Sequence, residues 1–399
     1  MLAVDSKPSG AEIFLNGKQQ NNPSFFPWKQ KHLTTAAKIK NILPGEYDLV
    51  LEREGYWPFH KKINIYSGQT TFIEDINLFR SDLPFLVYPA LEGELQLSVS
   101  KKYLYSAGES KIINLKDTAE KTWEINNQLP IYPGENKWLQ NSDQFFLAGQ
   151  WIDAEKNNSI DYQSIVGGEA FNWRLEEATG RLYYQNKEAL GYYDINQKSS
   201  RLILNQAEII DYYPIGGNIF LIIRQDKKTM LQRYEISSDK TENIGSLPSI
   251  GDYRFINNNK EFLEIYDYKN RSLYLINTQQ TARGLQQILN ALSWQWLDIN
   301  TILYNNSWEI RSFDISTNKI SLITRVGEEI KRVIWNKNKN YFIFTTDKTI
   351  SAINREQGII TTIFKTEKIS SPVLDEKGGN LYFWAKIGQQ EGVYHIMLQ

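Results

Sequence analysis

Three features of this sequence predict an all-β protein. Short runs rich in Val, Ile, Phe, Tyr and Thr recur along its 399 residues, and Asn, Asp, Lys or Gly fill the breaks between them. Apolar and polar residues alternate in the first fifth of the chain, as in strands with one buried face. Beyond that point the strands group into units of about 40 residues. The sequence therefore predicts a small antiparallel β-sandwich over 1–79 and a repeat domain over 80–399.

Composition excludes several classes of function. Apolar residues make up 41% of the chain and aromatic residues 13%, which is enough for a packed core. The net charge of −1 argues against nucleic acid as a main partner, because phosphate-binding proteins carry a basic excess. The chain has no cysteine, which excludes thiol catalysis, disulfides and Cys-ligated zinc. No stretch approaches the about 20 apolar residues that span a bilayer, and no apolar region typical of a signal peptide opens the sequence, so we expect a natural N-terminal leader or anchor to be missing.

The first domain is predicted strand by strand from alternation and turn residues. Ile13 and Leu15 alternate with polar residues, and the Asn16-Gly17 pair that follows is a strong hairpin signal. Tyr47, Leu49 and Leu51 alternate in the same way. The predicted strands cover residues 2–6, 11–18, 38–42, 47–52, 61–65 and 70–78.

Three blocks in this domain occur in the order and spacing of a known family. They are SKPSGAEIFLNGK at 6–18, LPGEY at 43–47 and EGYWP at 54–58. This segment resembles a PEGA domain, although Ser9 replaces the Glu of the Pro-Glu-Gly-Ala signature. The resemblance implies an accessory β-module in a surface or periplasmic setting, and it implies no reaction.

An aromatic insertion interrupts this resemblance. Residues 19–35 contain Phe25, Phe26 and Trp28 between two prolines. One interpretation is an exposed loop that binds a partner or a membrane surface. The other is that these side chains pack on the neighbouring domain, since large aromatic residues are usually buried.

The repeat region divides into eight candidate units, each with four short strands. The units begin near Glu94, Asn136, Phe171, Ile209, Asp252, Leu292, Lys331 and Ser371. Units of this length and strand number are typical of β-propeller blades. They resemble the degenerate WD-like repeats of TolB-type propellers, without the Gly-His and Trp-Asp pairs of true WD repeats. Seven blades are the alternative to eight, because the second unit is irregular.

The last unit ends after its third strand, close to the end of the chain. The apolar segment Leu83–Pro89 lies just before the first unit and contains no charged residue. We expect it to supply the missing fourth strand, because completing the blade removes an exposed sheet edge.

No residue cluster predicts catalysis, a cofactor or a metal. His32, His60 and His395 have no Ser or Asp at a motif spacing, and no G-x-S-x-G elbow is present. The segment WIDAEKNNSID (151–161) has alternating oxygen ligands but lacks the Gly and the bidentate Glu of a calcium loop. The Gly-Gly pairs lack a phosphate-binding pattern and are interpreted as turns.

Four aromatic residues are the candidate binding surface of the repeat domain. Trp294 and Trp296 share one face of a predicted first strand, because strand side chains alternate. Tyr212 and Tyr213 end another first strand. We expect these four at the rim of a propeller channel, where they contact a glycan or a protein. The alternative is that they fill the core between blades.

The sequence thus predicts a non-enzymatic binding or scaffolding protein of the cell envelope, outside the cytoplasm, with a protein or polysaccharide partner. One alternative is a glycan-acting enzyme with two carboxylates at the channel mouth. Another is the extracytoplasmic sensor domain of a membrane-anchored protein. Fold alone does not separate these functions.

Overall fold

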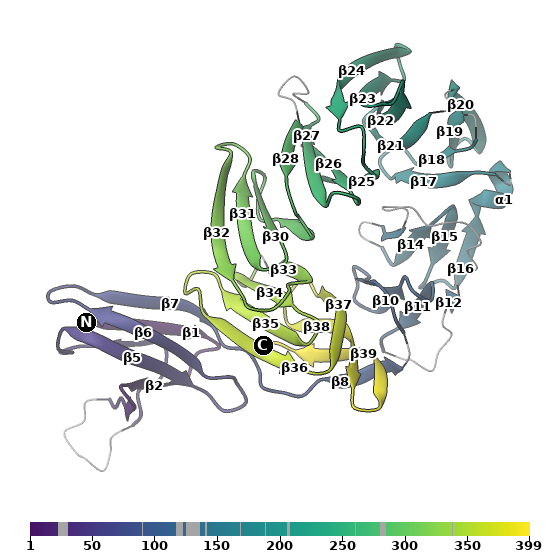
Figure 1. The fold of residues 1–399 in the computed structure, drawn as a ribbon. Coiled ribbons are helices and arrows are strands. Elements are labelled where there is room, and N and C mark those ends of the chain that lie inside the picture. Colours follow the sequence, from purple (N-terminus) through teal and green to yellow (C-terminus); the bar gives the residue numbers. More distant parts are fainter. Residues whose placement is uncertain are drawn as a thin grey trace. The chain divides into compact units, whose positions relative to one another are not determined.

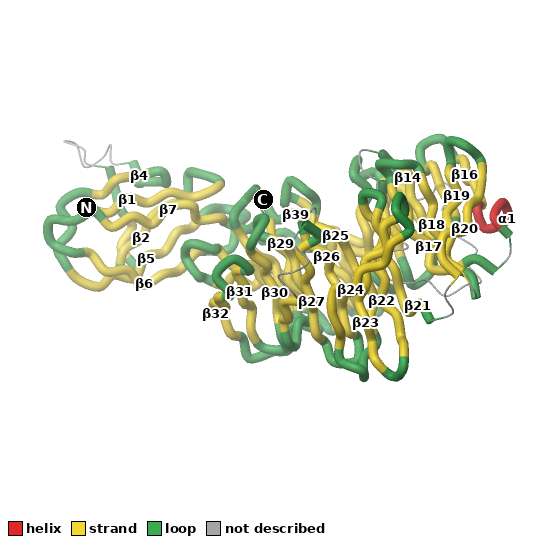
Figure 2. The backbone as a smooth tube through the Cα atoms, turned by 90° about the horizontal axis from the view of Figure 1, so that it is seen from above, coloured by secondary structure: helices red, strands yellow, loops and turns green. Residues whose placement is uncertain are grey.

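The computed structural model describes residues 1–22, 31–89, 91–116, 123–124, 136–139, 142–167, 169–187, 189–205, 208–259, 261–279, 285–336 and 338–399. Strands dominate these residues, together with one short helix, α1 (Tyr162–Val166) (Figures 1 and 2). The chain forms two compact units, one of Met1–Leu95 with Ser293–Gln399 and one of Gln96–Leu292.

The N-terminal domain is a sandwich of two sheets. One sheet has the order β4-β1-β7 and the other β3-β2-β5-β6. The strands are β1 (Leu2–Lys7), β2 (Glu12–Leu15), β3 (Lys18–Gln19), β4 (Ala37–Ile39), β5 (Gly45–Glu52), β6 (Phe59–Ile65) and β7 (Thr71–Asn77). All pairs are antiparallel, as predicted, except β1 with β7, which is parallel because the chain crosses the other sheet between these two strands.

Alternation gives the sandwich its core. Ile13, Leu15, Leu49 and Leu51 are buried and pack between the sheets, while their neighbours along each strand face solvent. Asn16 and Gly17 both have positive φ, which matches the predicted two-residue hairpin turn between β2 and β3.

Eight four-stranded antiparallel sheets follow among the described residues, and five of them run from β9 to β28. The first sheet contains β9 (Leu95–Leu97), β10 (Tyr103–Ser106), β11 (Lys111–Asn114) and β12 (Trp123–Glu124). The second contains β13 (Asn136–Trp138), β14 (Gln144–Leu147), β15 (Gln150–Asp153) and β16 (Asn158–Asp161). The next is β17 (Phe171–Glu176), β18 (Arg181–Gln185), β19 (Ala189–Asp194), β20 (Ser199–Asn205). The fourth contains β21 (Ile209–Ile215), β22 (Asn218–Gln225), β23 (Lys228–Glu235) and β24 (Lys240–Leu247). The fifth contains β25 (Tyr253–Asn259), β26 (Phe262–Asp267), β27 (Ser272–Asn277) and β28 (Leu285–Ile288). The irregular second unit therefore still forms a complete sheet.

The remaining three sheets belong to the same compact unit as the sandwich. Two of them are β29 (Ser293–Trp296), β30 (Thr301–Asn305), β31 (Glu309–Asp314), β32 (Lys319–Arg325), and β33 (Arg332–Asn336), β34 (Tyr341–Thr345), β35 (Thr349–Asn354), β36 (Ile360–Lys365). The third is β37 (Lys368–Leu374), β38 (Asn380–Ile387), β39 (Gln390–Met397) with β8 (Phe85–Pro89).

Strand β8 completes the last sheet, as predicted for Leu83–Pro89. It pairs antiparallel with β39 and places Leu86 opposite Tyr394 and Pro89 opposite Gly392. The outer edge of β39 is thereby covered, which removes an exposed row of backbone donors and acceptors.

Within each compact unit, clusters of buried side chains join consecutive sheets of the described repeat region. One cluster joins Phe342 and Phe344 of β34 to Leu303 and Ile310 of the preceding sheet. Every residue of strands β26 and β34 is buried, so neither strand has a solvent-exposed face. Sheets that pack on both sides in this way have the arrangement of propeller blades, and we call them blades below.

The described part of the chain holds no helix with the length and apolar character needed to cross a membrane.

Candidate functional site

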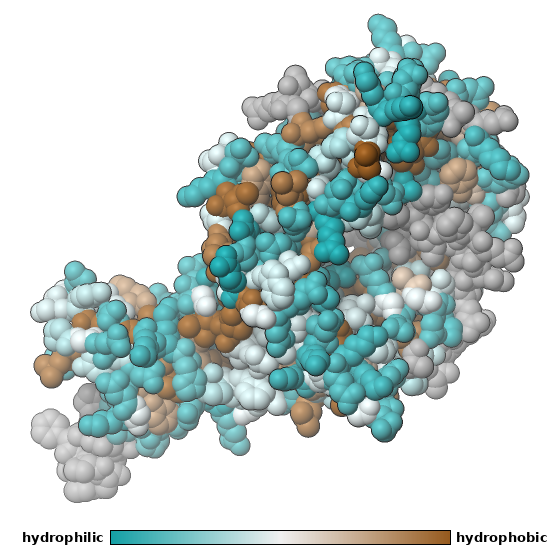
Figure 3. Space-filling view, viewed as in Figure 1, coloured by the Kyte–Doolittle hydropathy of each residue, from teal (hydrophilic) through white to brown (hydrophobic). Residues whose placement is uncertain are grey.

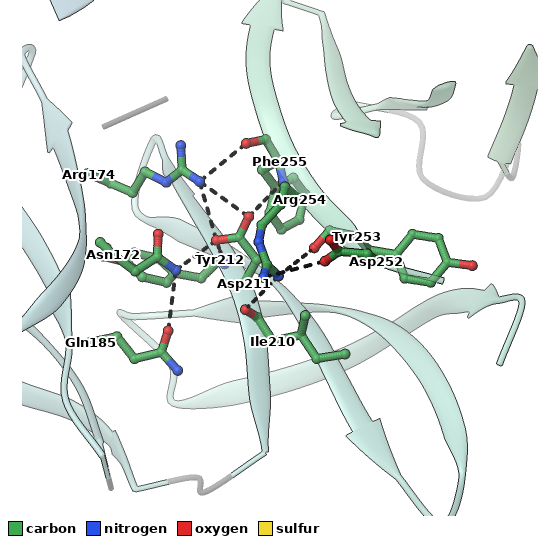
Figure 4. A network of polar contacts seen from close by, with 10 residues as sticks. All are labelled: Asn172, Arg174, Gln185, Ile210, Asp211, Tyr212, Asp252, Tyr253, Arg254 and Phe255. Carbon is green, nitrogen blue, oxygen red and sulfur yellow. Dashed lines mark hydrogen bonds and ion pairs between the residues drawn. The ribbon is translucent and has the colours of Figure 1, made fainter. Parts of the chain in front are cut away.

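A buried polar network joins the first strands of three consecutive blades (Figure 4). Its centre is Asp211 on β21, which is fully buried. The Asp211 Oδ2 atom lies 3.2 Å from Arg174 Nη2 of β17 and accepts a 2.7 Å hydrogen bond from the Phe255 backbone N–H of β25. Asn172 Nδ2 donates to Asp211 Oδ1 at 2.8 Å. The carboxylate is therefore held by donors from the blade before and the blade after.

The contacts of this network indicate a structural role, because they join strands of neighbouring blades. Both oxygens of Asp211 accept hydrogen bonds from protein groups, and Arg174 also donates to the Phe255 carbonyl at 3.2 Å. Donors from β17 and β25 thus engage this carboxylate, and the contacts tie the first strands of the three blades together. Its neighbour Tyr213 lies with its ring centroid 5.9 Å from the Arg174 guanidinium, and burial raises the pKa of the Tyr213 hydroxyl.

The prediction that Tyr212 lies on a rim surface is wrong. Tyr212 is fully buried, and its hydroxyl donates to the Asn172 carbonyl at 2.5 Å. Adjacent strand residues point to opposite faces, so Tyr212 packs with the preceding blade and Tyr213 with Phe255 of the following one. The two tyrosines therefore form no common cluster.

Trp294 and Trp296 lie on β29 and are half-buried. They alternate with Ser293 and Gln295, whose side chains hold the next blade. Ser293 Oγ accepts from the Val333 N–H at 2.9 Å, and Gln295 Oε1 accepts from the Trp335 N–H at 2.7 Å. The two tryptophans thus share the face of β29 opposite to the one that carries Ser293 and Gln295. Their role in binding stays a prediction.

The remaining predicted binding residues, Phe25, Phe26 and Trp28, lie outside the described residues. The acidic segment at 151–161 forms the hairpin of β15 and β16, in which Asp153 accepts from the Lys156 N–H and Asp161 caps helix α1. No group of three or more His, Asp or Glu side chains in the described part of the chain is arranged to hold a metal ion.

Sequence reasoning missed an exposed tryptophan in the turn between β30 and β31. Trp308 is 52% exposed and lines an open depression of about 420 Å³ with Asn306, Glu309, Arg325 and Val326. Asn306 Oδ1 accepts from the backbone N–H groups of Trp308 and Glu309, at 2.9 and 2.8 Å, and so fixes the turn. The signal in the sequence was Asn305-Asn306-Ser307, which places Trp308 in a turn.

The charges around this depression are ordered by Glu309, whose carboxylate is buried. Arg325 Nε donates to Glu309 Oε1 at 2.8 Å, and Arg311 Nε donates to Oε2 at 2.7 Å. Hydrogen bonding from Arg325, and then from Arg311, lowers the pKa of Glu309. The Arg325 side chain itself is 69% exposed, so its guanidinium presents charge to solvent beside the indole.

A second depression, of about 750 Å³, lies on the sandwich. Its lining residues are Gly10, Glu12, Glu52, Arg53, Glu54, Gly55, Tyr56 and Pro58. Arg53 lies 5.2 Å from the centroid of the Tyr56 ring and donates to the Ser9 carbonyl, so its charge is already engaged. This depression has acidic side chains but no exposed aromatic platform comparable to Trp308.

Comparison with known proteins identifies a fold. No family model matches the chain, and no curated protein matches it in sequence. Among solved structures it is similar to Porphyromonas gingivalis dipeptidyl peptidase 4, with a TM-score of 0.53 and 8% identity over 78% of this chain and 59% of that one. The repeat region has a β-propeller fold.

Two further similarities are weaker. An oligogalacturonate lyase in complex with manganese is 13% identical over 64% of this chain and 83% of its own, with a TM-score of 0.40. An oligogalacturonate lyase from Vibrio parahaemolyticus is 9% identical over 79% and 91%, with a TM-score of 0.39. At these identities the likeness concerns the fold, and the function has to be argued from the sites.

Proposed function

We propose that this chain is a non-enzymatic binding protein of the cell envelope that holds a glycan on its propeller blades. The observation that carries the proposal is the Trp308 depression. An exposed indole offers an electron-rich flat face to the C–H groups of a sugar ring. Beside it, the exposed guanidinium of Arg325 supplies donors for sugar hydroxyls, while Asn306 and the buried Glu309 hold the turn and the arginine in place.

The same depression supports binding more than catalysis. A glycosidase of the usual kind needs two carboxyl groups about 5 to 10 Å apart. The residues that line this depression include one carboxylate, Glu309, and two arginines engage its oxygens. The enzyme alternative would therefore need a different site.

The sandwich supports the location. Its sequence resembles a PEGA domain, a module of surface and periplasmic proteins, and its described strands form a small β-sandwich as that resemblance implies. On this proposal the sandwich positions the chain in the envelope, and the blades present their loops to the glycan.

Intrinsic fluorescence tests the proposal. The protein is titrated with cell-wall fragments and a panel of envelope polysaccharides, and a saturable change in tryptophan emission is expected for at least one of them. Trp308→Ala should abolish the change. Trp57→Ala removes another exposed tryptophan, on the sandwich, and should leave it intact. A flat response across the panel, or a response unaffected by Trp308→Ala, overturns the proposal. A response lost with Trp294→Ala and Trp296→Ala instead assigns binding to β29.

A further inference from the structure

One end of the sandwich gathers exposed apolar side chains from separate segments. Strand pairing places Leu2 opposite both Ile39 and Thr71, and Gly45 opposite Ile65. The segments 38–45 and 66–72 therefore meet at the end of the sandwich where β1 starts. We call these two segments the sandwich tip.

Hydrogen bonds fix the tip as one structure. The Thr71 hydroxyl donates to the Asn64 carbonyl at 3.0 Å and so ties β7 to the end of β6 in the other sheet. The Thr71 N–H donates to the Met1 carbonyl at 2.9 Å, and the Tyr47 hydroxyl donates to the Leu43 carbonyl at the same distance. The loops at this end thus have defined positions.

Three large apolar side chains of the tip are turned to solvent. Leu43 is 77% exposed, Tyr66 59% and Phe72 62%. They come from the β4–β5 loop, the β6–β7 loop and the start of β7. Figure 3 shows apolar side chains at the end of the sandwich that carries the N-terminus in Figure 1. None of the three lines either depression described above. Exposed apolar residues gathered in this way mark an interaction surface.

The charged side chains within the two tip segments are basic, and the exposed acids Glu46 and Glu74 lie just beyond these segments. Segments 38–45 and 66–72 contain Lys38 and Lys40 and no acidic residue. Lys38 lies opposite Ala3, and Ala3 lies opposite Phe72, so a lysine and a phenylalanine share a row on the outer face of the β4-β1-β7 sheet. Lys62 on β6 is exposed, and the nearby acid, Glu46, lies 3.7 Å from it.

We propose that the sandwich tip binds the surface of a lipid bilayer that carries anionic headgroups. Apolar side chains on exposed turns enter the boundary between headgroups and acyl chains, and tyrosine favours this boundary. Lysines beside them are attracted to the negative surface potential. The combination of Leu43, Tyr66 and Phe72 with Lys38 and Lys40 supplies both contributions. The proposal is independent of glycan binding at Trp308.

Vesicle sedimentation of the full chain tests the proposal. The protein is mixed with vesicles of phosphatidylcholine alone or of phosphatidylcholine with phosphatidylglycerol. Binding to the anionic vesicles is expected, and it should weaken as salt rises. Leu43→Ser with Phe72→Ser should lower the affinity about tenfold or more, because two apolar side chains no longer enter the lipid. Lys38→Gln with Lys40→Gln should weaken binding to anionic vesicles only.

A matched control lies on another part of the same compact unit. Ile320 and Leu322 on β32 are 51% and 55% exposed, similar to the tip residues, and Ile320→Ser with Leu322→Ser should bind vesicles as the unchanged protein does. Failure to sediment with anionic vesicles overturns the proposal, as does equal loss of binding in this control.

A depth measurement separates insertion from adsorption by charge alone. Tyr66→Trp places an indole at the tip, and brominated acyl chains should quench its added emission. Binding without this added quenching overturns the insertion of the tip.

Discussion

Asn354 holds both backbone polar groups of Asn77. The Asn77 N–H donates to Asn354 Oδ1 at 2.7 Å, and Asn354 Nδ2 donates to the Asn77 carbonyl at 3.1 Å. Both residues are buried, one at the end of β7 in the sandwich and the other at the end of β35. Asn77 Nδ2 also donates to the Lys339 carbonyl at 2.8 Å. One amide side chain thus fastens the sandwich to a blade.

Asn354→Ala is expected to destabilise this compact unit. The N–H and carbonyl of Asn77 would lose their partners while buried, and each loss costs about 1–3 kcal/mol. Urea unfolding should show a free energy of unfolding lowered by about 2–4 kcal/mol, with faster proteolysis between the sandwich and β8. Asn64→Ala, at an exposed position of β6, is the control and should leave both unchanged. Equal stability of Asn354→Ala and the control would contradict this role.

The buried pair of Arg174 and Asp211 predicts a non-additive mutant cycle. Arg174→Met leaves the charge of Asp211 buried without its ion-pair partner. Asp211→Asn leaves the charge of Arg174 buried without its partner, and it also turns an amide donor toward the Phe255 N–H. Each single change should lower the free energy of unfolding by about 3–5 kcal/mol. The double change should cost clearly less than the sum of the two, by urea unfolding. Additive losses would show that the two side chains do not act as a pair.

We predict that the burial of His395 lowers the free energy of unfolding in acid. It is buried between the rings of Phe85 and Tyr382, with centroids 4.8 and 4.7 Å away, and its Nε2 lies 2.9 Å from Asn380 Oδ1. Burial lowers its pKa below the ordinary value of 6.5. Below pH 6.5 the unfolded chain therefore binds this proton before the folded one does, so stability falls as the pH drops through this range.

The size of that effect is about 1.4 kcal/mol for each unit by which the folded-state pKa is lowered. Unfolding in urea at pH 7.5 and at lower pH measures it. His395→Gln, which keeps a donor for Asn380 and does not titrate, should reduce the pH dependence. Identical pH profiles for His395→Gln and the unchanged protein would contradict the prediction.

A substitution at Gly392 tests how much the pairing of β8 with β39 stabilises the protein. A Cβ atom at this position would lie 2.3 Å from the Tyr88 carbonyl oxygen and 2.9 Å from the Pro89 Cα, both backbone atoms of β8. Gly392→Val should therefore push β8 away and lower the thermal midpoint by several degrees. Gly379→Ala is the matched control in the same blade, because a Cβ there meets no atom within 4 Å. An unchanged midpoint for Gly392→Val would show that β8 adds little stability.

Local signals in the sequence predicted most of the fold. Residues close together in the sequence determine the Asn16-Gly17 turn, the alternation through β5 and the four-stranded units. The strand at Leu83–Pro89 was predicted because the last unit would otherwise have an unpaired edge. Parallel pairing of β1 with β7 was not predicted, because it depends on a long crossover between them.

The site residues depended on contacts that the sequence does not display. Tyr212 was predicted at a surface but is buried, because neighbouring blades cover both faces of β21. Asp211 and Arg174 are 37 residues apart, and nothing local pairs them. The exposure of Trp308 depends on a turn held by Asn306 and on Arg325, which arrives from the end of another strand.

The pairing of β8 with β39 has a consequence for synthesis on the ribosome. Leu86 is translated about 300 residues before Tyr394, its partner across the sheet. At roughly 5–20 residues per second, β8 waits about 15–60 s for its neighbour strand to be made. During that time its apolar residues and backbone groups have no β39 to pair with. The nascent chain thus passes through a stage at which β8 has been made but the last blade cannot yet form.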